Sequence, residues 1–112
     1  MDCLFCKIIE GVIPSDKVYE DEHVYGFKDI NPTAPTHLLF IPKVHMKNLT
    51  ESEGKEDALL HLFKAIRSYV REEGLDEEGY RLVINAGKLG QQTVDHLHVH
   101  LITGRQLTWP AG

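Results

Sequence analysis

The sequence predicts an α+β fold in which a mainly antiparallel five-stranded sheet packs against one long and one short helix. Five short runs have the composition and alternation of β-strands, and one segment repeats apolar residues at the three- and four-residue spacing of a helix. These segments do not follow the regular strand–helix–strand order that is typical of a parallel sheet. At 112 residues, the chain is expected to form one domain, residues 1–112.

The first elements are a short helix and a hairpin. The helix is expected at Phe5–Glu10 and ends at Gly11. Val, Tyr and Phe are frequent in Lys17–Glu20 and His23–Lys28, so both runs are predicted strands. The acidic residues between them favour a hairpin turn.

Three further strands are predicted. Thr36–Pro42 follows a loop interrupted by two prolines, and as a strand it places His37 on one face. Tyr80–Asn85 alternates as a fourth strand, and Ala86–Gly90 is predicted to be a turn. The fifth strand is predicted at Gln92–Ile102.

The long helix is predicted from one apolar stripe of about four turns. Gly74 is expected to end this helix, and Thr50–Glu53 has the pattern of a capping box for its start. The stripe is interpreted as core packing, and its residues are Leu59, Leu62, Phe63, Ile66 and Val70.

Charge and hydropathy exclude some classes of protein. The formal net charge of −5 argues against non-specific binding to nucleic acid, which requires basic surface to neutralise phosphates, so no nucleic-acid partner is expected. No apolar run approaches the roughly 20 residues of a membrane span. The N-terminus has neither the basic nor the apolar region of a signal peptide, so a cytoplasmic location is expected.

Three histidines stand at alternate positions of the last predicted strand: His96, His98 and His100. Since successive strand side chains point to opposite faces, the three imidazoles are expected to share one face, opposite an aliphatic row. A face of this kind is typical of a metal site or of a catalytic site, because neutral imidazole is both a ligand and a base. A purely structural role in hydrogen bonding is the third interpretation.

Cys3 and Cys6 form a CxxC pair near the N-terminus. In a cytosolic chain such a pair more often binds a metal or acts in redox chemistry than forms a structural disulfide. Two free cysteines are the alternative. A tetrahedral zinc site would need two further ligands, and the candidates are His45 and His96.

Three blocks of the sequence resemble the histidine triad (HIT) family, and in particular its Hint branch of bacterial nucleoside phosphoramidases. His96–Ile102 fits the family's signature of histidines separated by apolar residues. Asp29–Lys43 resembles the family's first sequence block, and Gly104–Gly112, with its Trp-Pro pair, resembles the C-terminal tail of the Hint branch. Together these blocks span nearly the whole chain, and the resemblance implies the HIT-like form of the α+β fold.

The resemblance implies a role for each polar residue near the phosphate. His98 would be the nucleophile that takes the α-phosphoryl group of a nucleotide, and His100 would hold the phosphate oxygens. His37 would orient or protonate the leaving group, although the proton could also be handled by His100. The hydroxyl of Thr93 would bond the phosphate or the leaving atom.

The resemblance also implies which residues contact the nucleoside. Asp29 would accept hydrogen bonds from the ribose hydroxyls, while Ile30 and Phe27 would flank the base. Asn85 matches the Asn of the Hint branch, where the related dinucleotide polyphosphate hydrolases carry Gln. Without the resemblance, Asp29 would be read as a turn cap and Asn85 as the end of a strand.

The resemblance further implies a structural zinc ion bound by Cys3, Cys6, His45 and His96, and no organic cofactor. His96 would then be a metal ligand while His98 is catalytic. His23 and His61 are expected to be ordinary surface or packing residues, and Asp95 is expected to have little effect on the chemistry.

The activity implied is that of a hydrolase that cleaves purine nucleoside 5′-phosphoramidates through a covalent nucleotidyl-histidine, with AMP- or GMP-like substrates. One alternative is a dinucleoside polyphosphate hydrolase, and another is a non-enzymatic nucleotide-binding partner protein. The family also implies a homodimer, formed mainly by the long helix and Tyr80–Asn85, with Trp109 near the partner's pocket.

Overall fold

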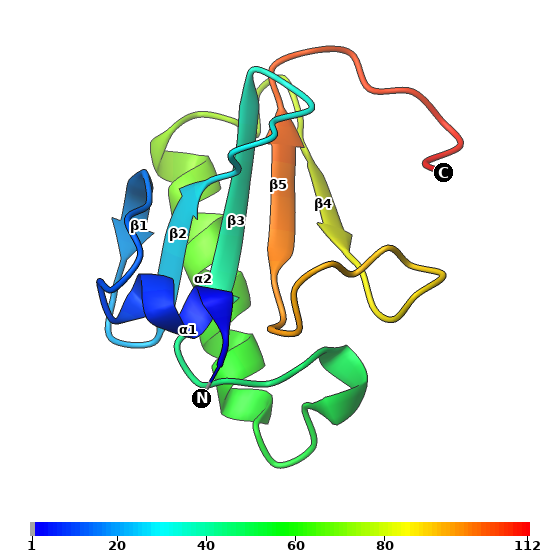
Figure 1. Cartoon of the computed structure of the whole chain (residues 1–112). Helices are drawn as coiled ribbons and strands as arrows, with labels where there is room; N and C mark the ends of the chain where they lie inside the picture. Colours follow the sequence, from blue (N-terminus) through cyan, green and yellow to red (C-terminus); the bar gives the residue numbers. More distant parts are fainter. Residues whose placement is uncertain (1) are drawn as a thin grey trace.

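The computed structural model describes residues 2–112, and the predicted α+β class is confirmed. Five strands form one antiparallel sheet in the order β1-β2-β3-β5-β4, so β1 and β4 are its outer strands (Figure 1). The elements in chain order are α1 (Leu4–Ile9), β1 (Lys17–Glu20), β2 (Val24–Lys28), β3 (Thr36–Pro42), the 3₁₀ turn η1 (Leu49–Glu51), α2 (Glu56–Glu72), β4 (Arg81–Ile84) and β5 (Val99–Thr103).

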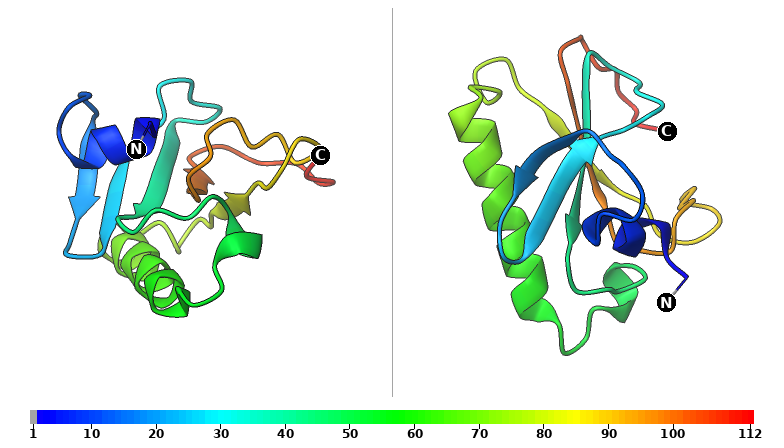
Figure 2. Two further views of the ribbon diagram at one scale, coloured as in Figure 1. Left: turned by 60° about the horizontal axis from the view of Figure 1, so that its bottom comes forward. Right: turned by 60° about the vertical axis from the view of Figure 1, so that its left-hand side comes forward.

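The two α-helices lie on opposite faces of the sheet (Figure 2). On one face, α2 packs its buried residues against Leu38 and Phe40 of β3. On the other face, α1 packs Phe5 and Ile8 against a cluster that contains Leu39 and Ile41. Alternation along β3 therefore divides its side chains between two cores, as the period of a strand requires. His37 shares the face of Leu39 and Ile41, as predicted.

The start of α2 differs from the prediction. Thr50–Glu53 does not cap the helix, because it belongs to η1 and a following turn in which Gly54 has a φ of +81°. The α2 helix begins at Glu56, and its N-cap Lys55 makes no side-chain capping bond. The end of α2 is as predicted, since Gly74 follows it with a φ of +66°, a conformation that favours glycine.

The predicted strand Gln92–Ile102 is too long at its N-terminal end. Only Val99–Thr103 forms β5, and pairing with β3 stops at Val99. Beyond this point the N–H of Leu97 bonds the carbonyl of Met46, and the N–H of His96 bonds the carbonyl of Val94 in a tight turn. Hydrogen bonding outside the ladder therefore overrides the alternating pattern, and His96 does not lie on the same strand face as His100.

Within residues 2–112, no helix combines the length and the apolar character needed to cross a membrane. The C-terminal tail runs from β5 along the top of the sheet and away from its edge (Figure 1). Its Trp109 side chain is 82% exposed.

Candidate active site and metal cluster

Four side chains from three segments converge where α1, the loop after β3 and the loop before β5 meet. Nδ1 of His96 lies 3.4 Å from Sγ of Cys3 and 3.6 Å from Sγ of Cys6. Nδ1 of His45 lies 3.5 Å from Sγ of Cys6 and 3.2 Å from Nδ1 of His96. All four ligand atoms lie within 4.8 Å of one another.

This spacing fits tetrahedral zinc. Zinc–nitrogen and zinc–sulfur bonds of ordinary length place two nitrogens about 3.3 Å apart and a nitrogen and a sulfur about 3.6 Å apart. The Nε2–H of His96 donates to the carbonyl oxygen of Pro42 over 2.8 Å, so Nδ1 keeps the lone pair that a metal needs. Burial lowers the pKa of His96 to about 4, which keeps the ring neutral. The predicted ligand set is therefore assembled by the fold, and it leaves no coordination position open.

His98 is held as a single tautomer by its own loop. Its Nδ1–H donates to the carbonyl oxygen of His96 over 2.8 Å, so the lone pair is on Nε2. The ring is buried, and its centroid lies 5.1 Å from that of His100 and 5.1 Å from that of Phe5. A neutral imidazole with one free ring nitrogen is the form that can act as a nucleophile.

His37 and His100 form a second hydrogen-bonded unit. The two residues are diagonal neighbours on β3 and β5, and Nε2 of His37 lies 2.9 Å from Nδ1 of His100. The backbone N–H of Thr33 donates to Nδ1 of His37 over 3.0 Å, so the ring proton of His37 is on Nε2. His37 therefore donates to His100, and the ring proton of neutral His100 is on Nε2.

Asp29 completes this unit. Its Oδ2 lies 3.3 Å from Nε2 of His37 and 4.0 Å from Nδ1 of His100, while Oδ1 accepts the N–H of Asn31 over 2.8 Å. Burial, followed by the nearby His98 and His37, lowers the pKa of His100 to about 4, although Asp29 acts in the opposite direction. At neutral pH, His100 is therefore uncharged.

A cavity of about 290 Å³ lies beside these histidines, and its lining is mostly apolar. The predicted residues Phe27, Asp29, Ile30, Thr93, His98 and His100 all line it. His37 lies behind His100 and is not among the lining residues, nor is Asn85, which is half-buried at the end of β4. The structure thus brings the predicted phosphate and nucleoside residues together, with the exception of Asn85.

The sequence interpretation missed one wall of this cavity. Leu4, Phe5 and Ile8 of α1, with Ile13 and Pro14 just beyond it, line the side that faces β2 and β3. The spacing of Leu4, Phe5 and Ile8 is helical, and it predicts an apolar face on α1. What that face would cover depends on where the CxxC pair is anchored, and a pattern within one segment does not contain this information.

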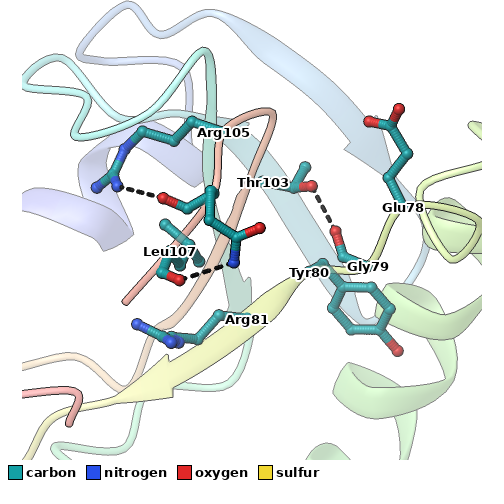
Figure 3. A pocket seen from close by; sticks show the side chains of 8 residues that line it. Glu78, Gly79, Tyr80, Arg81, Thr103, Arg105 and Leu107 are labelled. Atoms are coloured by element: carbon teal, nitrogen blue, oxygen red, sulfur yellow. Dashed lines mark hydrogen bonds between the residues drawn. The ribbon is translucent and has the colours of Figure 1, made fainter. Parts of the chain in front are cut away.

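A second cavity, of about 220 Å³, lies at the far end of the sheet between β4 and the tail (Figure 3). It contains Arg81 and Arg105, but both guanidinium groups bond backbone carbonyls, those of Thr108 and of Thr33 and Gln106. Glu78 also lies at this cavity, so its charges are mixed. It has no side chain in common with the histidine cavity.

Comparisons with known proteins agree on one family. A family model described as HIT domain matches residues 10–107. The "14 kDa zinc-binding protein" of Zea mays is 50% identical over 112 residues, which cover 97% of this chain and 87% of that protein.

Solved structures agree with the sequence comparisons. The HIT family hydrolase from Legionella pneumophila Philadelphia 1 superposes with a TM-score of 0.94 at 46% identity, over 99% of this chain and 100% of that chain. The histidine triad nucleotide-binding protein from Candida albicans gives a TM-score of 0.84 at 37% identity, over 99% of this chain and 85% of that chain. Both similarities include the α1 segment, which the family model does not cover.

Proposed function

The chain belongs to the HIT domain family, and on this premise we propose that it hydrolyses purine nucleoside 5′-phosphoramidates through a covalent nucleotidyl-histidine on His98. Structural relatives that carry the name HIT family hydrolase support the broader statement that the protein is a hydrolase. The observation that carries the proposal is the bond from Nδ1–H of His98 to the carbonyl of His96, which leaves the lone pair on Nε2.

The proposed reaction has two displacement steps. In the first, Nε2 of His98 bonds the α-phosphorus, the P–N bond to the leaving amine breaks, and its electron pair stays on the amine nitrogen. That nitrogen gains one proton from the His37–His100 pair, which is neutral in the free protein and would take this proton up from solvent when the anionic substrate binds. In the second step, water attacks phosphorus and gives one proton back to the His37–His100 pair, the bond to Nε2 breaks, and the nucleoside monophosphate leaves.

The lining of the cavity suits a purine nucleoside, the part of the substrate that stays bound after the amine leaves. Phe5, Ile8 and Phe27 offer apolar surface to a flat base, and Asp29 supplies a carboxylate at the edge of the cavity for the ribose hydroxyls. The Nε2–H of neutral His100 and the hydroxyl of Thr93 would donate to the phosphate oxygens. Their donors are in place before substrate arrives, which is the condition for electrostatic stabilisation.

We also propose that zinc in this protein is structural. Cys3, Cys6, His45 and His96 would hold it, and the ion would supply a cross-link between α1, the loop after β3 and the loop before β5. Four protein ligands leave no position for water or substrate, which is the arrangement of structural sites. The zinc-binding name of the Zea mays relative supports this assignment.

A homodimer is proposed for the assembly. Strand β4 is an outer strand of the sheet, and it exposes Leu82, while α2 exposes Leu60 and Phe63. An outer strand with exposed apolar residues can pair with the same strand of a second copy and so extend the sheet.

The test of the reaction is a rapid-quench experiment with adenosine 5′-phosphoramidate, followed by mass spectrometry of the intact chain. We expect an AMP adduct on the peptide that contains His98, and its loss in His98→Ala. His61→Ala, which removes an imidazole from α2, is the matched control and should keep the adduct. Full turnover by His98→Ala would refute the proposal. Faster turnover of a diadenosine polyphosphate than of the phosphoramidate would favour the polyphosphate hydrolase instead.

A further inference from the structure

The ring of Phe5 packs against both the proposed nucleophile, His98, and one residue of the metal cluster, His96. Its centroid is 5.1 Å from that of His98, with the two ring planes at 90°. It is also 6.0 Å from the ring of His96 at 66° and 5.4 Å from the ring of Phe27 at 75°. The side chain is only 4% exposed, so these three rings and the sheet below enclose it.

The chain positions of the ligands fix Phe5 from both sides. Cys3 precedes it by two residues and Cys6 follows directly, and both thiols point at Nδ1 of His96. The thiol of Cys3 also caps α1 by accepting the N–H of Cys6 over 3.3 Å. A helix of six residues is too short to be stable alone, so its position depends on such anchors.

We propose that Phe5 is a positioning residue for His98, and that the metal cluster sets its place. This inference rests on the proposed function of His98. The bond to the His96 carbonyl secures only one edge of the His98 ring. A half-turn of the ring about its Cβ–Cγ bond would break that bond and put carbon where Nε2 stands. The Phe5 ring, perpendicular to the imidazole with the two centroids 5.1 Å apart, occupies space beside it and opposes this turn.

A second consequence concerns the metal. His96 is a ligand through its ring, and through its backbone carbonyl it holds His98. Phe5 contacts both imidazoles. Loss of the metal therefore loosens both constraints on His98, although no coordination bond reaches that residue. The coupling acts through packing and one hydrogen bond.

The test compares Phe5→Leu with Phe27→Leu, two substitutions that remove rings of the same size from the same cavity. Ring ¹⁵N NMR of His98, recorded without substrate, reports which ring nitrogen carries the proton and whether the ring exchanges between states. In the wild type we expect the Nδ1–H form alone. In Phe5→Leu we expect exchange-averaged signals at unchanged zinc content, and a roughly three- to tenfold fall in kcat. Phe27→Leu should raise KM and leave the His98 signals as in the wild type.

Removal of the metal by a chelator should give exchange-averaged ring ¹⁵N signals for His98, as Phe5→Leu does. If the metal-free protein unfolds, His45→Ala, which leaves three ligands in place, carries the measurement. Sharp wild-type signals for His98 in folded Phe5→Leu, or in the folded metal-depleted protein, would overturn the proposal. Since the NMR measurement needs no turnover, it decides the role of Phe5 even if the phosphoramidate is not a substrate.

Discussion

The backbone N–H of Thr33 donates to Nδ1 of His37 over 3.0 Å, and this one bond determines which nitrogen of His37 carries the proton. From there the order of donors is fixed, because Nε2–H of His37 must donate to Nδ1 of His100. Thr33 is itself held from the C-terminal side of the chain, since Nε of Arg105 donates to its carbonyl over 2.8 Å.

Arg105 is therefore predicted to influence catalysis without touching the substrate. Arg105→Met removes the bond to Thr33 and should lower kcat by roughly three- to tenfold, the effect of losing one hydrogen bond. Arg81→Met removes a comparable bond, to the carbonyl of Thr108, in the same cavity and is the matched control. Steady-state kinetics with adenosine 5′-phosphoramidate checks this, and equal effects of the two substitutions would contradict it.

His100 is predicted to make stability depend on pH. Its pKa falls from 6.5 to about 4 on folding, so between these values the unfolded chain binds more protons than the native protein. The contribution of neutral His100 is complete above about pH 6.5 and is lost as the pH falls toward 4, at a cost of about 2 kcal/mol between pH 7 and pH 5. Urea unfolding at both pH values should give a smaller pH dependence in His100→Asn. Metal release at low pH affects both proteins, so the difference between them isolates His100.

Asp29 is predicted to recognise the ribose. A carboxylate that accepts hydroxyl hydrogen bonds should favour adenosine 5′-phosphoramidate over its 2′,3′-dideoxy analogue by roughly tenfold or more in kcat/KM. Asp29→Ala should abolish that preference, because neither substrate then has a carboxylate partner. Asp95→Ala, a substitution on the exposed loop before His96, should retain it. A preference that survives in Asp29→Ala would show that the ribose is held elsewhere.

The metal cluster is predicted to contribute to folding. Cys3→Ser removes one of four ligands and should lower both zinc content and the melting temperature, the latter by roughly 10 °C. Elemental analysis and calorimetry of protein purified without added metal measure the two effects. His61→Ala should leave the zinc content at about one ion per chain. If the wild-type protein contains no zinc and a chelator does not change its melting temperature, the proposed zinc site is refuted.

The dimer is predicted to depend on β4. Light scattering at micromolar concentration should give the mass of two chains for the wild type. Leu82→Lys places a charge on the outer strand, at a residue that is 36% exposed, and should shift the mass toward one chain. Val12→Lys introduces the same charge at an exposed apolar residue after α1 and should remain dimeric.

Much of the fold follows from local patterns. The bounds of β1 and β3 are those predicted, and β2, β4 and α1 differ by a single residue at their ends. The side chains of β3 are apolar on both faces because each face meets a separate core, so the strand is recognised as a short apolar run that follows Pro35 and ends at Pro42.

The loop before β5 shows where such patterns fail. His96, His98 and His100 alternate with apolar residues, yet His96 lies outside the strand, because the N–H of Leu97 bonds the carbonyl of Met46 and the His96 ring lies against Cys3 and Cys6. Alternation alone does not distinguish a histidine that stays on a strand from one that turns toward a distant cluster. The family resemblance makes this distinction, because it assigns His96 and His98 to different tasks.

The same limit applies to the α1 wall and to the tautomers. Phe5 lies at the cavity because Cys3 and Cys6 meet His96, which is 93 and 90 positions away from them in the chain. The proton positions on His37 and His98 depend on single backbone groups, those of Thr33 and His96. The type of a side chain does not predict which backbone group it will hydrogen-bond in the folded protein.

Strand β3 fixes the spacing between the histidine site and the metal cluster. His37 near its start belongs to the histidine pair, and the carbonyl of Pro42 at its end orients the metal ligand His96. A single inserted residue between them would turn every later side chain to the opposite face and move that carbonyl along the strand. The segment between His37 and Pro42 thus has a length that neither site can change independently of the other.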